Sequence, residues 1–148
     1  MELLSLNSEK FEKVGAALEL ELLLKDLEVR ELPENTVALI NEQIKEVNNL
    51  SPEAKNLSKK IKTAESRILN LLAKGPGIVP KNYYTTLWLP LGMSAFGLPI
   101  GTAIFAITGN VAFIGIGLPI GMAVGSYYGS SLDKKAEKED RVLNIDKQ

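Results

Sequence analysis

Residues 82–132 form a stretch of 51 residues without a single charged side chain. The rest of the chain is rich in charge: residues 1–81 carry 12 basic and 13 acidic side chains, and residues 133–148 carry five of each. A soluble domain rarely extends so far without charge, whereas charge near the centre of a bilayer is costly. The stretch therefore predicts an integral membrane protein with the lipid bilayer as its first partner.

The length of the stretch predicts two membrane-spanning helices, at about residues 87–107 and 111–131, within a transmembrane hairpin over residues 81–132. The first helix would be about 31 Å long at about 1.5 Å per residue, which is enough to cross the hydrocarbon core. Thr108-Gly109-Asn110 is the predicted turn. Because this turn is short, we expect the two helices to be antiparallel neighbours.

The charges beside the hairpin predict its orientation. Lys74 and Lys81 precede the first helix, and four basic residues, Lys134, Lys135, Lys138 and Arg141, follow the second. The positive-inside rule then predicts a two-pass protein of the cell inner or plasma membrane with both termini in the cytoplasm. The aromatic residues that would anchor this end of the hairpin at the interface are Tyr83, Tyr84, Trp88, Tyr127 and Tyr128.

Small residues recur at intervals of four in the predicted spans. In a hairpin centred on Gly109, Gly97 is level with Gly121 and Gly101 with Gly117. The second span adds Gly125 and Gly129, which have no glycine opposite them. Small residues at this spacing let helices approach closely in lipid. The matched glycines are explained by packing within one hairpin, whereas the unmatched ones favour contacts between chains.

The row of Gly117, Gly121, Gly125 and Gly129 resembles the glycine-zipper pattern of small oligomeric membrane proteins, including some mechanosensitive channels and pore-forming toxins. The resemblance covers only about residues 92–130. It implies self-association into a homo-oligomer through these glycines.

Pro99 and Pro119 are level with each other in the same hairpin and are predicted to lie near mid-bilayer. Each proline frees the carbonyl four residues earlier, at Ala95 and Gly115. Such a carbonyl needs a partner or a water-filled cavity. One interpretation is a tolerated kink whose carbonyl is satisfied by Ser94, Thr102 or a neighbouring helix. The other is a ring of carbonyls that forms a gate.

Residues 1–74 predict a cytoplasmic module of three helices, so the whole chain is expected to be all-α. The first helix would run from Asn7 or Ser8 to about Arg30, with a core stripe at Phe11, Val14, Leu18 and Leu22. Leu20, Leu23, Leu24 and Leu27 widen this stripe, which predicts burial on more than one side of the helix. The second helix would run from Pro33 or Glu34 to Val47. The third would have Ser51 as its N-cap and Pro52 as its first residue, and it would end before Gly75, which is expected to adopt the left-handed conformation that closes a helix. Residues 75–80 are expected to be a Gly/Pro linker, and residues 133–148 a charged cytoplasmic tail.

Charge is uneven within the module, because residues 1–44 hold four basic and ten acidic side chains, whereas residues 45–81 hold eight and three. Complementary packing of the third helix on the first would explain this. Alternatively, Lys55, Lys59, Lys60 and Lys62 face anionic lipid heads. A slightly acidic chain with a net charge of −1 argues against nucleic-acid binding.

The composition argues against an enzyme. With no Cys and no His, the chain lacks thiolates and the usual general base, and no nucleophile–base pair, metal cluster or phosphate loop is visible. We therefore expect no catalytic residues, no metal and no cofactor. Two hypotheses remain. One is a homo-oligomeric membrane assembly, such as a small channel or pore with a cytoplasmic assembly or gating module. The other is a membrane-anchored scaffold or adaptor whose residues 1–74 bind a partner protein.

Overall fold

The structure is a computed structural model that describes residues 2–11 and 14–145. All regular elements within these residues are helices, which confirms the all-α fold class. The chain divides into two compact units. One unit comprises residues 1–80 and 142–148, and the other comprises residues 81–141. The second unit is therefore inserted between two segments of the first.

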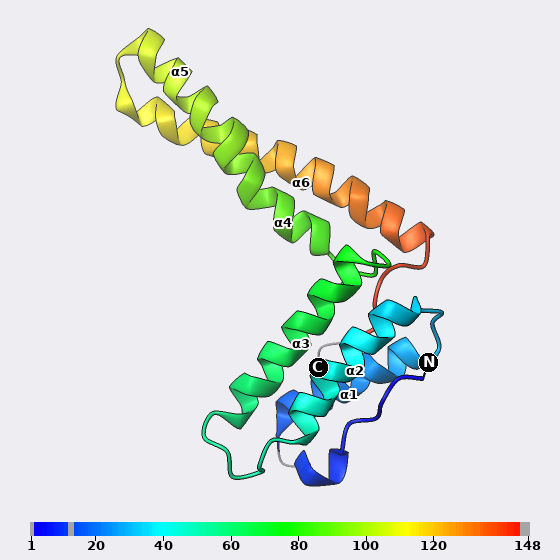
Figure 1. Cartoon of the computed structure of the whole chain (residues 1–148). Helices are drawn as coiled ribbons and strands as arrows, with labels where there is room; N and C mark the ends of the chain where they lie inside the picture. The colour runs from blue at the N-terminus through cyan, green and yellow to red at the C-terminus, as the bar shows by residue number, and fades with distance from the viewer. Residues whose placement is uncertain (1, 12–13, 146–148) are drawn as a thin grey trace. The chain divides into compact units, whose positions relative to one another are not determined.

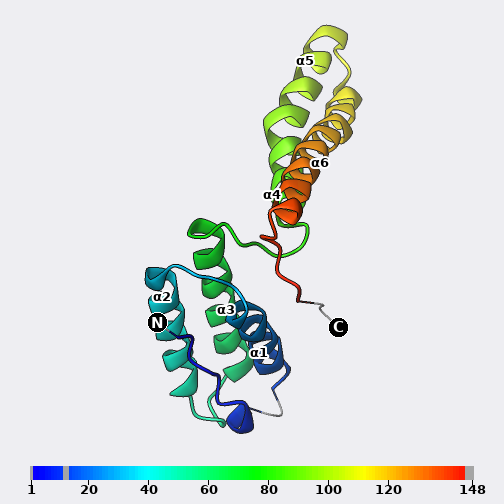
Figure 2. The ribbon, with the colours of Figure 1, turned by 90° about the vertical axis from the view of Figure 1, so that its right-hand side faces the viewer.

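The first unit is built on three helices, preceded by the short 3-10 helix η1 (Ser8–Phe11). They are α1 (Gly15–Glu28), α2 (Glu34–Asn48) and α3 (Leu57–Lys74). α3 packs against both α1 and α2 (Figure 2). The largest side chains that are fully buried in this unit are Phe11, Leu20, Leu23, Leu27, Ile40, Ile44, Ile61, Ile68 and Leu72. Residues 2–7 run without helical structure beside α2 and are held there by asparagine side chains.

The first helix differs from its prediction. A single helix from residue 7 or 8 to residue 30 was expected, but η1 ends at Phe11 and α1 begins at Gly15. Phe11 is buried as expected, whereas Leu18 and Leu22 are exposed. The core face of α1 is formed by Ala16 and Ala17 together with the four leucines that were expected to widen the stripe, Leu20, Leu23, Leu24 and Leu27. The break before α1 changes the rotation of the helix, so the stripe that continued from Phe11 does not apply to it.

α2 lies within one residue of its predicted bounds, but α3 starts at Leu57, five residues later than predicted. Ser51 does not cap a helix. Its carbonyl accepts a hydrogen bond from the amide of Ala54, and the amide of Leu57 donates to the carbonyl of Ala54. These turns place Leu50 and Ala54 against the core. Tertiary packing therefore overrides the local capping signal at Ser51.

Residues 75–80 are not a linker but part of the first unit. Ile78 and Val79 are buried, and the amide of Ile78 donates to the carbonyl of Leu72. Gly75 was expected in the left-handed conformation, but its φ is −88°. Gly77, with φ +74°, is the residue that adopts it.

The chain returns to the first unit after the hairpin. Val142 pairs with Val79 in an isolated parallel bridge, and Leu143 is buried in the core. The Arg30 guanidinium donates to the Val142 carbonyl at 2.8 Å and is paired with Asp26. The segment after residue 141 is therefore anchored in the module, although residues 133–148 were expected to form a charged tail. Asp146 to Gln148 lie outside the described residues.

The second unit is a helical hairpin. Its first arm consists of α4 (Tyr83–Gly92), the π-helix η2 (Met93–Gly97) and α5 (Leu98–Thr108). Its second arm consists of the 3-10 helix η3 (Val111–Phe113) and α6 (Ile114–Lys138), which lies alongside the first arm (Figure 1). The predicted turn is present, with Gly109 at φ +70° and the Asn110 side chain accepting from the amide of Ala112.

Candidate functional site: the glycine-packed hairpin

The row of glycines on α6 packs directly on the backbone of the first arm. A Cβ atom added to Gly117 would lie 2.0 Å from the carbonyl oxygen of Gly97. One added to Gly121 would lie 2.5 Å from the carbonyl oxygen of Gly92. Only glycine permits backbones this close. The structure also brings together the pairs that were expected to be level, since Gly117 faces Gly101 and Gly121 faces Gly97.

Gly125 and Gly129 also pack within the hairpin. A Cβ on Gly125 would lie 2.2 Å from the carbonyl oxygen of Trp88, and one on Gly129 would lie 2.6 Å from the Cα of Thr85. Both were expected to lack a partner within the chain and to contact other chains. That premise is wrong, because a glycine can be covered by the backbone of a larger residue as well as by another glycine. No glycine of this row is therefore left over to contact another chain.

The π-helix keeps the glycines of the first arm on one face. The first arm presents Gly92, Gly97 and Gly101, of which Gly92 was not identified from the sequence. The spacing from Gly92 to Gly97 is five residues, which would place them about 140° apart around an α-helix. η2 occupies this interval and takes one more residue per turn, with the amide of Leu98 donating to the carbonyl of Met93. Both glycines therefore face α6.

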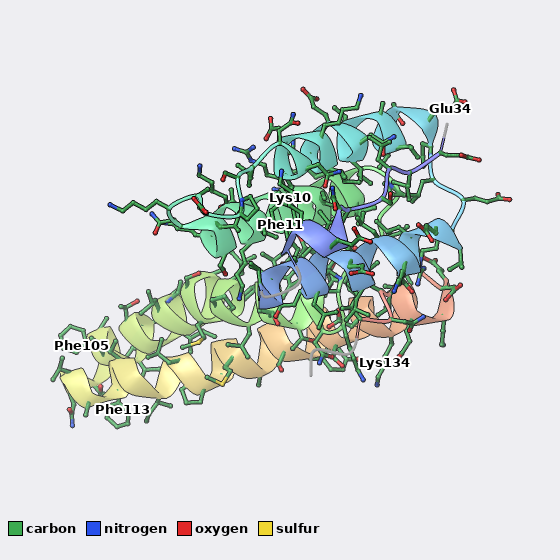
Figure 3. The ribbon with its side chains drawn as sticks, turned by 90° about the horizontal axis from the view of Figure 1, so that it is seen from below. Lys10, Phe11, Glu34, Phe105, Phe113 and Lys134 are labelled. Carbon is green, nitrogen blue, oxygen red and sulfur yellow. The ribbon has the colours of Figure 1, made fainter. Side chains whose placement is uncertain are left out.

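Burial in the hairpin is inverted relative to a soluble protein. All buried residues of its described helices are glycines except Ala136. Large apolar side chains point outward instead, Phe105 and Phe113 among them at the turn end (Figure 3). Tyr83–Thr108 and Val111–Lys138 are each long and apolar enough to cross a membrane, and only 17% of the most apolar window of each is buried. A core helix of a soluble protein would have most of this surface covered.

Four hydroxyl groups on the outer surface of the hairpin are paired within their own helix. Ser94 donates to the carbonyls of Pro90 and Leu91, and Thr102 donates to those of Leu98 and Pro99. Thr86 and Thr108 likewise donate to the carbonyl four residues earlier. These side chains present no unpaired hydroxyl donor to their surroundings. This is the arrangement that polar groups need in lipid.

The prolines lie on the outer surface. Pro99 and Pro119 are both exposed, as is Pro90, which stands inside α4 and was not considered from the sequence. In one interpretation, Ser94, Thr102 or a neighbouring helix satisfies the carbonyl that Pro99 frees at Ala95. The structure excludes the two side chains from this role, because their hydroxyls donate to other carbonyls. η2 ends two residues before Pro99, and such π-type adjustment accommodates a proline in a membrane helix.

The aromatic residues gather at the open end of the hairpin. The Trp88 ring contacts the Tyr128 ring edge to face, with centroids 4.4 Å apart, and so joins the two arms. Tyr83 and Tyr84 are in a similar contact at 5.2 Å, and Tyr127 is 81% exposed. Rings that are both apolar and able to hydrogen-bond prefer the membrane–water interface.

Asp133 closes the open end of the hairpin and was not singled out from the sequence. It follows Gly129 by four residues and therefore continues the glycine face of α6. Its two carboxylate oxygens accept from the amides of Tyr84 and Thr85, each at 2.9 Å. These are amides of the first turn of α4, where a carboxylate is also favoured by the helix dipole. The spacing of four from Gly129 is the sequence signal that could have revealed this role.

Charge at the same end is held by a second pair. Arg141 donates from its guanidinium to Glu139, and this hydrogen bond lowers the pKa of the Glu139 carboxyl. The same contact raises the pKa of Arg141, with a smaller contribution from the Tyr84 hydroxyl. The pair keeps a cation beside the aromatic residues. This is the location that the positive-inside rule favours.

The substitution Asp133→Ala should uncouple the start of α4 from α6. We expect it to destabilise the hairpin by about 1 kcal/mol, the usual cost of a lost helix cap. Hydrogen exchange at the amides of Tyr84 and Thr85 measures the effect directly, and both should lose protection. Asp133→Asn keeps one acceptor oxygen and should protect one amide. Glu137→Gln, one turn further on and exposed, is the matched control, and faster exchange in that variant would contradict the assignment.

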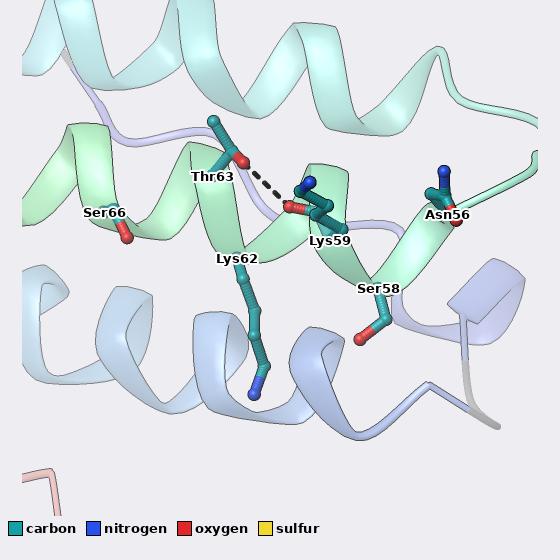
Figure 4. Close-up of a pocket in the computed structure, with 6 residues that line it drawn as sticks. All are labelled: Asn56, Ser58, Lys59, Lys62, Thr63 and Ser66. Carbon is teal, nitrogen blue, oxygen red and sulfur yellow. Dashed lines mark hydrogen bonds between the residues drawn. The ribbon is translucent and has the colours of Figure 1, made fainter.

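The described residues contain no further site with the geometry for chemistry. No group of three or more metal-ligating side chains occurs among them. An open depression of about 590 Å³ lies on the polar face of α3, next to α1 (Figure 4). Lys59 and Lys62 at its rim are exposed, and Lys62 lies 3.9 Å from Glu19 of α1. This pair supports complementary packing of α3 on α1, although Lys55, Lys59 and Lys60 remain exposed to solvent.

Comparison with protein families, curated proteins and solved structures found no match to this chain.

Proposed function

We propose that the protein is a two-pass membrane anchor that displays a helical binding module on one side of the bilayer. The observation that carries the proposal is the inverted burial of the hairpin, in which glycines are inside and large apolar side chains are outside. Water would oppose this arrangement, because it leaves apolar surface uncovered. In lipid the outer surface costs nothing, and close backbone packing holds the helices together.

The connectivity supports a module on a single side. The segments that enter and leave the hairpin are paired with each other through Val79 and Val142. Both ends of the hairpin are thus tied to the same unit. With Lys81, Lys134 and Lys135 at these ends and no charge at the turn, the positive-inside rule assigns the module to the cytoplasm.

The surface of α1 favours a binding role for the module. Leu18 and Leu22 lie on one stripe of α1 and are 60% and 41% exposed, and Val29, the residue after the end of this helix, is 84% exposed. Clustered exposed apolar side chains are typical of protein–protein contact surfaces. They account for the leucines of α1 that exceed the needs of the three-helix core. This observation moves the adaptor hypothesis ahead of the channel hypothesis, whose main support was the supposed surplus of Gly125 and Gly129.

Cysteine labelling tests the membrane topology without background, because the chain has no Cys. Asn110→Cys, at the turn, and Lys138→Cys, at the end of α6, are labelled in lipid vesicles with a maleimide that does not cross membranes. If the hairpin spans the membrane, one of the two positions lies outside the vesicle in either orientation. The labelled fractions at the two positions should therefore add up to one for any mixture of orientations. Glu9→Cys should follow Lys138→Cys. Complete labelling at all three positions in sealed vesicles would contradict the proposal.

The mass of the protein in detergent separates the two functional hypotheses. A self-contained anchor should be a monomer by native mass spectrometry, since its glycine face is used within one hairpin. A discrete assembly of three or more chains would overturn this part of the proposal. Such an assembly would favour the homo-oligomeric channel hypothesis again. Conductance measurements on variants of Pro99 and Pro119 would then be the next experiment.

A further inference from the structure

Two asparagines of α2 hold the segment at residues 2–7, which we call the strap. Asn41 accepts from the amide of Leu4 at 2.8 Å and donates to the carbonyl of Glu2 at 2.9 Å. Asn48 repeats this pattern three residues along, because it accepts from the amide of Asn7 at 2.9 Å and donates to the carbonyl of Ser5 at 3.1 Å. Each asparagine side chain thus forms hydrogen bonds with the amide of one strap residue and with the carbonyl of the strap residue two positions before it.

The spacing of the two asparagines along α2 matches the spacing of the strap residues that they bind. Asn41 and Asn48 are seven residues apart, about 10.5 Å along an α-helix. Three residues of extended chain cover about 10 Å. A helix with asparagines at this spacing therefore pairs with any extended backbone, because the hydrogen bonds involve main-chain groups alone. The sequence of the bound segment matters only at the positions whose side chains point toward the core.

The side chains of the strap define what such a backbone must carry. Leu6 is 7% exposed, and Leu3 packs against the core, whereas residues 2, 4, 5 and 7 are exposed. The groove beside α2 in which the strap lies thus accommodates two apolar residues three positions apart. Beyond Leu3 a cavity of about 370 Å³ continues the groove and is lined in part by Leu27, Leu32 and Val37. A segment with an additional apolar side chain would have room there that the strap leaves unused.

Asn41 offers two hydrogen bonds to the backbone that occupies the groove. It is 8% exposed beneath the strap, and both of its polar atoms are used by the strap. With the strap removed, the Asn41 amide would face water, and another extended backbone could replace that water with the same two hydrogen bonds. The strap bears the entropy cost of ordering several extended residues. A segment of another protein bears that cost and the entropy cost of association as well, so it competes only through contacts that the strap lacks, such as an apolar side chain in the cavity beside Leu3.

We propose that the groove formed by Asn41, Asn48 and the adjacent core is a binding site for an extended peptide segment of another protein, with the strap as its internal competitor. The ligand is a segment with apolar residues at positions i and i+3, paired through its backbone. This site lies on α2 and is distinct from the apolar stripe of α1. It goes beyond the anchor function and does not depend on membrane insertion.

The test uses the full chain in detergent and a fluorescent peptide with the sequence of residues 2–11 as the probe. Leu3→Asp combined with Leu6→Asp releases the strap, and we expect the probe to bind this opened variant at least about tenfold more tightly than the wild type. Asn41→Ala combined with Asn48→Ala in the opened variant should weaken binding by about tenfold or more, since four hydrogen bonds are lost. A probe with both leucines replaced by aspartate is the matched control.

Hydrogen exchange on the wild-type protein keeps the test independent of the folding of the opened variant. Excess unlabelled probe should capture the open groove and speed exchange at the amides of Leu4 and Asn7. The inference is overturned if the probe changes neither exchange rate, if it binds the folded opened variant no better than the wild type, or if the two asparagine substitutions leave its affinity unchanged. None of these results bears on the cysteine-labelling test of the anchor.

Discussion

Gly117→Leu should open the hairpin. A side chain at residue 117 would begin 2.0 Å from the carbonyl oxygen of Gly97 and 2.5 Å from the amide nitrogen of Gly101. Neither group can move aside, because both are backbone atoms within a helical arm. We expect a loss of about 3 kcal/mol or more, at or beyond the upper end of the cost of overpacking. The helices must separate to relieve it.

Gly115→Leu is the matched control on the same helix. A Cβ at residue 115 meets nothing within 4 Å, so leucine would point to the surroundings of the hairpin. We expect a change within about 0.5 kcal/mol, as for surface substitutions in general. The comparison holds the side chain, the helix and the added apolar surface constant. It varies only the face on which the side chain lies.

The single tryptophan supplies the readout. Trp88 contacts Tyr128 across the two arms, so its fluorescence should change when the arms separate. Unfolding in mixed detergent micelles, followed by this signal, gives the midpoints for the wild type and both variants. Equal midpoints for Gly117→Leu and the wild type would contradict the close backbone packing. Gly121→Leu should behave like Gly117→Leu, which means that it reports on the hairpin and not on contacts between chains.

The features that the sequence predicts best are those set by simple periodicity. The uncharged stretch and Gly109 locate the two arms and their turn, because the cost of charge in lipid and the left-handed turn at glycine both act locally. The bounds of α2 follow from Pro33 and one regular apolar stripe. In each case a single local rule decides, and no competing contact opposes it.

The features that were missed depend on contacts between distant residues. Ile78 and Leu143 belong to the core of the first unit, and Val79 is also buried, although a linker and a tail were expected around them. Their glycine and proline neighbours indicate irregular backbone correctly, but irregular backbone can still be buried. Asp133 looks like any charged residue of a helix end until the first turn of α4 is placed opposite it.

The π-helix is the clearest example of a feature hidden by a locally regular sequence. The row on α6 has a spacing of four throughout, whereas the first arm has a spacing of five between Gly92 and Gly97. Read as an α-helix, this interval puts the two glycines on different faces. Only the requirement that both face α6 indicates the extra residue per turn. The mismatch between the two arms was present in the sequence but had no meaning without their pairing.

Two single-residue deletions test this explanation of the π-helix. Ala95 lies in η2 and Ala123 lies in α6, and both are exposed. Deleting Ala95 changes the spacing from Gly92 to Gly97 to four, so a regular α-helical turn can replace the π turn. Pro99 would then stand inside an α-helix, a position that Pro119 already occupies in α6. We expect this deletion to leave the hairpin closed.

Deleting Ala123 should have the opposite result. It changes the spacing from Gly121 to Gly125 to three and rotates the rest of α6 by about 100° relative to the glycines before it. Gly125, Gly129 and Asp133 would then leave the face that contacts α4, and larger side chains would replace them. We expect a loss of several kcal/mol, about the cost of overpacking at more than one position.

The same Trp88 signal and the same unfolding midpoints distinguish the two deletions. The contact between Trp88 and Tyr128 lies beyond Ala123 on α6, so it should be lost in the Ala123 deletion and kept in the Ala95 deletion. Both variants lose one exposed alanine, which makes each a control for the other. If the Ala95 deletion opens the hairpin as much as the Ala123 deletion does, the π turn is not a correction of glycine spacing. The extra residue would then have to be required by Pro99 itself, and Ala95 deletion combined with Pro99→Ala should restore the closed hairpin.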